Sequence, residues 1–218
     1  MKATELERLT RQYLIPRLPG YLAKGPLVYH GSTEHLLRGF YFERSSHGDR
    51  GFFVWVFVQP LYIPSDHLAF SFGDRLPHLA EGADRFWQIR EGGEAEVMDD
   101  ILRLAEDAGL AFLNRFPTVE SLPDGLVRSF PGSLGSRALE AIAYAHVLSD
   151  SPEKAMTALR RLKDQVSEAS QKLPKRVWLH EIGERAQKVE DALGRSSEAA
   201  KAVLNEWSEE TRKALGIG

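Results

Sequence analysis

The run from Phe52 to Pro60 (FFVWVFVQP) constrains the fold of this chain more than any other segment. It is almost entirely aromatic or β-branched and carries no charge, which is typical of a strand covered on both faces. Side chains alternate along a strand, so aromatic residues should line one face and valines the other. The run is far too short to span a bilayer. It therefore predicts a central strand of a sheet.

The flanking sequence predicts the neighbours of this strand. Three further strands are expected, over Leu27–Tyr29, Leu36–Glu43 and His67–Phe72. Gly, Ser and Asp are concentrated between Ser45 and Gly51, which is typical of a hairpin connection. Because strands joined by short connections usually pair antiparallel, we expect a meander. A helix near Thr4–Leu14 should precede the sheet, and a helix from Glu94 that Gly109 can cap should follow it.

Beyond residue 135 the spacing of apolar residues is that of helices. Four helices are expected, and their predicted starts are Ser136, Ser151–Pro152, Pro174 and Ser196 or Ser197. Short connections favour an antiparallel bundle, in which Ala143–Leu162 resembles at best one tetratricopeptide-type helical hairpin.

The sequence thus predicts an α+β protein, with an antiparallel β-meander sheet flanked by helices and followed by an all-α C-terminal bundle of about four helices. The stretch between Phe116 and Gly135 holds three prolines and three glycines and is interpreted as the boundary. The expected organisation is a sheet module over residues 1–125, a linker over 126–135 and a helical module over 136–218.

Composition narrows the classes of function. The 218 residues include no cysteine, which excludes disulfides, thiolate zinc sites and cysteine nucleophiles. With no apolar run long enough to cross a bilayer, we expect a cytoplasmic protein without a membrane partner. The net charge is −3, and neither half has the positive excess that non-specific nucleic-acid binding needs, which makes nucleic acid a disfavoured partner.

Residues that could support catalysis are few. The seven histidines form no closely spaced metal-binding pair, and no phosphate-binding or G-x-S-x-G motif is present, so neither a metal site nor a cofactor is expected. Asp66, His67 and Asp74 bracket a predicted strand, and a carboxylate and an imidazole that met there could serve as general acid and base. The alternative is that they are ordinary polar residues of turns.

A basic cluster in the helical half is the best candidate for binding a partner. It comprises Arg160, Arg161, Lys163, Lys172, Lys175 and Arg176. Acidic residues are interleaved with it, so the alternative is a solvated helix face.

The first 125 residues or so also resemble a known group of proteins. Arg38-Gly39-Phe40, the run from Val58 to Pro64, Gly109–Leu113 and Phe116-Pro117-Thr118 occur together after an opening helix. In this combination the chain looks like uncharacterised small bacterial α+β proteins, some of which accompany toxin or defence genes as immunity-type partners. The resemblance implies a binding role and supplies no catalytic residues.

The expected function is therefore that of a non-enzymatic bacterial interaction protein, of the immunity or defence-accessory type, that binds a partner protein. Two alternatives stay open. One is a hydrolase-like enzyme of unrecognised type with acid and base residues near the sheet, and the other is a nucleic-acid-binding accessory protein. The oligomeric state is unknown.

Overall fold

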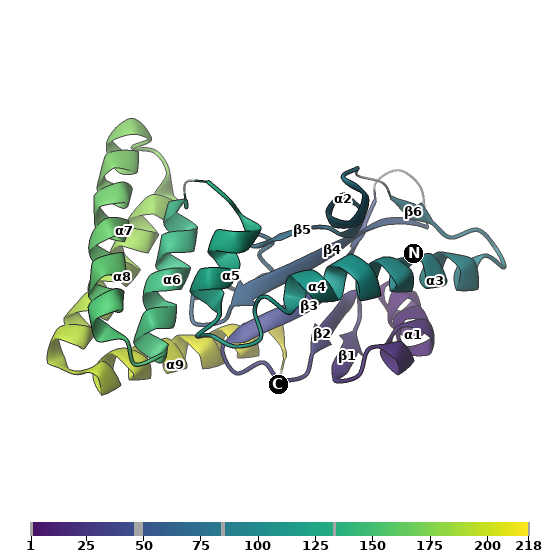
Figure 1. Ribbon diagram of the computed structural model, residues 1–218, viewed down its shortest axis with the longest axis horizontal. Helices are drawn as coiled ribbons and strands as arrows, with labels where there is room; N and C mark the ends of the chain where they lie inside the picture. Colours follow the sequence, from purple (N-terminus) through teal and green to yellow (C-terminus); the bar gives the residue numbers. More distant parts are fainter. Residues whose placement is uncertain (1, 46–49, 84–85, 133, 218) are drawn as a thin grey trace. The chain divides into compact units, whose positions relative to one another are not determined.

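The computed structural model describes residues 2–45, 50–83, 86–132 and 134–217 (Figure 1). Contacts divide the chain into two compact units. The first comprises residues 1–59 and 69–114, and the second comprises residues 60–68 and 115–218. An N-terminal antiparallel sheet with helices is followed by C-terminal helices that pack together, so the predicted α+β class is confirmed. In this division residues 60–68 and 115–125 belong to the second unit, whereas the sequence analysis assigned them to the sheet module.

The sheet of the first unit is built around the strand expected to be central. Its strands are β1 (Tyr21–Lys24), β2 (Leu27–His30), β3 (Leu36–Arg44), β4 (Gly51–Pro60), β5 (Gly73–Arg75) and β6 (Trp87–Gln88). Their order is β1-β2-β3-β4-β5, and β6 also pairs with β4. Val28 pairs with Phe40, Val56 with Asp74 and Phe52 with Trp87. Strand β4 therefore has hydrogen-bonded neighbours on both sides, as expected for a central strand.

The alternation along β3 and β4 gives the sheet two apolar faces. Phe40, Phe42 and Phe52 are buried on one of them. Tyr41 and Trp55 lie on the other, where the ring of Phe70 stands 5.2 Å from each of their centroids.

Helices complete the first unit. They are α1 (Ala3–Tyr13), a 3₁₀ turn η1 (Ile15–Arg17), α2 (Leu76–Glu81), α3 (Glu94–Leu104), a π-helical turn η2 (Ala105–Gly109) and α4 (Leu110–Leu113). Helix α1 packs against α3, and α2 packs against η2. Arg50 joins two of these elements, because its Nη2 atom donates to Glu5 at 2.7 Å and to Glu94 at 3.2 Å.

Three local expectations for the sheet and the helix that follows it differ from the structure or fall outside it. The segment His67–Phe72 forms no strand, because the amide of Ala69 donates to the side chain of Gln59 at 3.0 Å instead of to a sheet partner. Gly109 does not end a helix, since its φ of −64° keeps it helical between α3 and α4. The predicted turn between Ser45 and Gly51 lies largely at residues 46–49, outside the described residues.

The second unit consists of helices and one short segment from the middle of the chain. Its helices are α5 (Leu122–Ser129), α6 (Ser136–Leu148), α7 (Pro152–Lys172), α8 (Val177–Arg195) and α9 (Ser197–Leu215). Helix α6 packs against each of the other four. The predicted starts of α7 and α9 are confirmed, and the hydroxyl of Ser196 accepts the amide of Ala199 at 3.1 Å as an N-cap. Helix α8 begins at Val177 rather than Pro174.

Helix α5 occupies part of the stretch that the sequence suggested was irregular. None of the helices in the described part of the chain is both long and apolar enough to cross a membrane.

Candidate functional site

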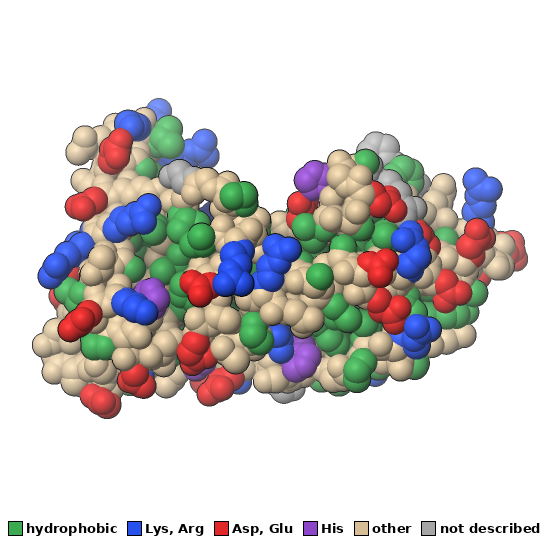
Figure 2. Space-filling view, viewed as in Figure 1, with side chains coloured by type: hydrophobic (Ala, Val, Ile, Leu, Met, Phe, Trp, Pro, Cys, Tyr) green, Lys and Arg blue, Asp and Glu red, His purple; other side chains and the backbone are tan. Residues whose placement is uncertain are grey.

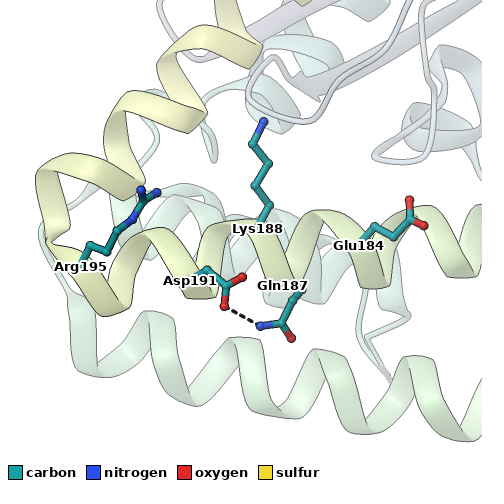
Figure 3. Close-up of a pocket in the computed structure, with 5 residues that line it drawn as sticks. All are labelled: Glu184, Gln187, Lys188, Asp191 and Arg195. Atoms are coloured by element: carbon teal, nitrogen blue, oxygen red, sulfur yellow. Dashed lines mark hydrogen bonds between the residues drawn. The ribbon is translucent and has the colours of Figure 1, made fainter.

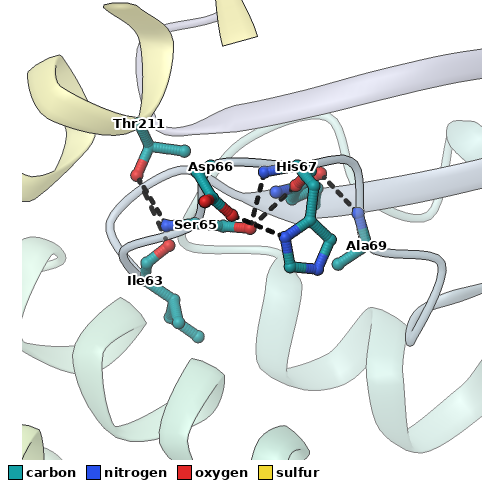
Figure 4. A network of polar contacts seen from close by, with 7 residues as sticks. Ile63, Ser65, Asp66, His67, Ala69 and Thr211 are labelled. Atoms are coloured by element: carbon teal, nitrogen blue, oxygen red, sulfur yellow. Dashed lines mark hydrogen bonds and ion pairs between the residues drawn. The ribbon is translucent and has the colours of Figure 1, made fainter. Parts of the chain in front are cut away.

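Asp66 and His67 form a close pair on the loop that precedes β5 (Figure 4). Asp66 Oδ1 lies 2.7 Å from His67 Nδ1, and this hydrogen bond is the main reason why the pKa of Asp66 is lowered. Both side chains are largely exposed, at 91% and 77%. The hydroxyl of the adjacent Ser65 donates to the His67 carbonyl oxygen at 2.7 Å, so it engages the backbone. The arrangement has the geometry of a hydrogen-bonded turn.

Asp74 makes a second, separate pair with a histidine. Its Oδ1 atom accepts the amide of Arg75 at 2.8 Å, and its Oδ2 atom lies 2.7 Å from Nδ1 of His78 in the first turn of α2. Asp74 belongs to the first unit, whereas Asp66 and His67 belong to the second. A general acid–base role for these three residues therefore stays a prediction. Over the described ranges, no cluster of His, Asp and Glu side chains has the geometry to hold a metal ion.

The six basic candidates separate into four places in the helical unit. Lys163 joins two helices, since its Nζ atom donates to Gln187 at 3.0 Å and to Glu190 at 2.6 Å. Arg160 borders a shallow hollow near the start of α7, and Arg161 lines a different groove. The remaining three, Lys172, Lys175 and Arg176, lie at the end of the α7–α8 hairpin.

The groove that Arg161 lines is formed by α5, α6 and α7 and has a volume of about 530 Å³. We call it the α5–α7 groove. Its apolar lining residues are Pro123, Val127, Leu134, Leu139, Ile142 and Ala158. Leu139 and Ile142 are nearly buried in its floor, whereas Val127 on α5 is 55% exposed. Figure 2 shows apolar side chains between α5 and α7 with charged side chains around them. Helix α5, which the sequence did not predict, supplies one wall.

Charged residues of both signs surround this apolar floor. They are Asp124, Glu153, Lys154 and Arg161, and His146 lies among them. The pKa of His146 is lowered, first by burial and then by the charge of Lys154, against the opposing effect of Asp124. Gln165 on α7 donates to the carbonyl oxygen of Leu134 at 3.2 Å and thereby ties the connection before α6 to α7. The groove is therefore mainly apolar inside and polar at its rim.

A second depression lies along α8 and is lined by Glu184, Gln187, Lys188, Asp191 and Arg195 (Figure 3). All of its lining residues come from this one helix, and Gln187 donates to Asp191 at 2.7 Å within it. A surface with a single wall buries little of any ligand, so the α5–α7 groove is the better candidate site.

A buried polar network that the sequence did not indicate lies in the core of the second unit. Arg185 on α8 donates to the Glu140 carboxylate through Nε at 2.7 Å and through Nη2 at 3.2 Å. The hydroxyl of Tyr144 donates to the same carboxylate at 3.3 Å. One stripe of α6 has helical spacing and consists of buried residues, namely Glu140, Tyr144 and Val147. The acidic Glu140 among apolar residues on this stripe was the signal in the sequence that could have indicated a buried ion pair.

The chain was compared with family models, curated proteins and solved structures. No family model, curated protein or solved structure matches it.

Proposed function

We propose that this protein is an interaction protein that binds an apolar segment of a partner protein in the α5–α7 groove. The observation that carries the proposal is Val127, an aliphatic side chain 55% exposed at the wall of a groove whose floor is apolar. Exposed aliphatic residues beside a concave apolar surface are typical of binding grooves.

The chemistry of the groove describes the segment that it would accept. Leu139 and Ile142 offer an apolar floor, so the partner should present aliphatic or aromatic side chains at helical or extended spacing. The rim carries both Asp124 and Lys154, so it would orient the segment by its charges without requiring a strongly acidic or basic partner. The resemblance of the first 125 residues to immunity-type proteins suggests a toxin or defence protein as this partner.

The test places a photo-crosslinking amino acid at position 127 in the native host and identifies the captured protein. The matched control carries the same group at Leu22, which is 50% exposed but lies on β1 of the first unit. We expect one defined partner from position 127 and not from position 22. Equal capture at both positions would mean that the groove has no special role.

The captured protein is then purified and titrated against the wild-type chain and Val127→Glu. A carboxylate in the apolar groove should weaken binding at least ~10-fold, about 1.4 kcal/mol. Because Val127 is half exposed, the substitution should leave the circular dichroism spectrum and the melting temperature nearly unchanged. An unchanged Kd would contradict the proposed site.

A further inference from the structure

The end of the α7–α8 hairpin extends beyond α6 within the helical unit (Figure 1). Gln165 of α7 contacts Leu134, just before α6 begins at Ser136, so the last turns of α7 continue past the start of α6. At the start of α8, the ring centroid of Trp178 lies 5.3 Å from Cζ of Arg137, in the first turn of α6. Residues 172–177, which we call the hairpin tip, therefore lie past the neighbouring helix.

The hairpin tip exposes two aliphatic side chains next to three cations. Leu173 is 49% exposed and Val177 is 68% exposed, which places them among the few large apolar side chains exposed in the described part of the chain. Figure 2 shows apolar and basic side chains together at this end of the hairpin. Lys172, Lys175 and Arg176 are all exposed as well.

No acidic residue lies between Glu168 and Glu181 in the sequence. From residue 169 to residue 180 the sequence has three basic residues and neither Asp nor Glu, although acids outnumber bases 31 to 28 over the whole chain. Lys172 pairs with Glu168 at 2.6 Å, but both side chains are about 70% exposed, at 70% and 68%, so water screens this pair. The tip therefore presents positive charge around its aliphatic residues.

We propose that the hairpin tip attaches this protein to the surface of an anionic lipid bilayer. Lys172, Lys175 and Arg176 would meet the negatively charged headgroups, while Leu173 and Val177 enter the boundary between headgroups and acyl chains. A convex tip cannot enclose a peptide or a small molecule, but a fluid interface adapts to it. The sequence suggested no membrane partner because no segment spans a bilayer, and peripheral attachment needs no such segment.

Sedimentation with vesicles tests this with the full-length chain. We expect binding to vesicles of phosphatidylcholine mixed with phosphatidylserine, little binding to phosphatidylcholine alone, and release by salt. Each basic residue near an anionic surface contributes about fivefold in affinity, so Lys175→Glu together with Arg176→Glu should reduce binding at least ~25-fold. Leu173→Ser with Val177→Ser should also weaken binding, by about tenfold or more.

The matched control is Arg160→Glu with Arg195→Glu, which changes the net charge equally at two exposed positions away from the tip. It should retain vesicle binding within about threefold. Circular dichroism should show that all variants are folded.

Four results would overturn the proposal. The first is equal loss of binding in the control, which would indicate a response to net charge alone. The second is an unchanged affinity in the serine variant, which would exclude insertion. Displacement from vesicles by inorganic phosphate, with the ionic strength held constant by chloride, would indicate a simple anion site. Equally tight binding to polyglutamate would indicate an acidic protein as the partner.

Discussion

At the scale of single residues, the helical unit contains a largely buried ion pair between Glu140 and Arg185, and taking these charges out of water is costly. The side chain of Glu140 is 2% exposed and that of Arg185 is 21% exposed. Burial raises the pKa of Glu140 in spite of Arg185, whereas at Arg185 the hydrogen bond and charge of Glu140 outweigh burial and raise its pKa. Loss of the partner should therefore destabilise the charged form of Glu140 more than the charged form of Arg185.

We expect Arg185→Met to destabilise the protein by about 3–5 kcal/mol, because it leaves a buried carboxylate without its charged partner. Replacing both residues by methionine should recover most of this loss, since the uncompensated charge is then gone. Urea unfolding followed by circular dichroism measures both free energies. If the double variant is no more stable than Arg185→Met, the pair does not act as a unit.

At the scale of elements, the helical segment from α3 to α4 shows why the prediction that Gly109 ends a helix was wrong. A glycine at the end of an apolar helical stripe is typical of a C-cap. Here the chain continues through η2 into α4, and the glycine instead allows close packing. A Cβ atom at position 109 would lie 2.6 Å from Cε1 of Phe40 on the sheet.

Gly109→Ala should therefore destabilise the protein by about 1–3 kcal/mol through overpacking against Phe40. Gly183→Ala is the matched control, because Gly183 lies inside α8 and the added Cβ atom would be 3.6 Å from Cγ1 of Val166 on α7, an ordinary contact distance. The control should stabilise the protein by up to about 1 kcal/mol through helix propensity. Thermal unfolding distinguishes the two, and a gain in stability at position 109 would show that Phe40 can move away.

At the scale of the whole molecule, the short segment 60–68 is part of the helical unit although it directly follows the central strand. Tyr62 is fully buried, its hydroxyl donates to the carbonyl oxygen of Ala141 at 3.0 Å, and its ring meets that of Tyr144. Thr211 on α9 accepts the amide of Ser65 at 3.4 Å. The helical unit is therefore incomplete without residues that precede it in the chain by about fifty positions.

We expect Tyr62→Ala to cost about 3–5 kcal/mol and to speed amide hydrogen exchange mainly in α6 and α9. Phe52→Ala, at a fully buried residue of β4, is the comparison and should speed exchange mainly in the sheet. Mass spectrometry of deuterated peptides reads out both patterns. Faster exchange confined to the sheet in Tyr62→Ala would contradict the assignment of this segment to the helical unit.

Much of the fold was predictable because its signals are local. The aromatic and β-branched run of β4 needs partners on both sides. Helix starts are marked locally, by Pro152 in the first turn of α7 and by the capping hydroxyl of Ser196 before α9. The candidate site was less predictable. Arg161 was among the expected partner-binding residues, but the groove that it lines depends on α5 lying beside α6.

By itself, the sequence determined the α+β class, the central strand and the starts of α3, α6, α7 and α9, because periodicity and local start signals act over a few residues. Only the tertiary structure decided which residues meet. It placed Tyr62 with the helices, paired Glu140 with Arg185 and packed Gly109 against Phe40. Each of these contacts joins positions far apart in the chain, and its free energy depends on burial and distance, which no local pattern records.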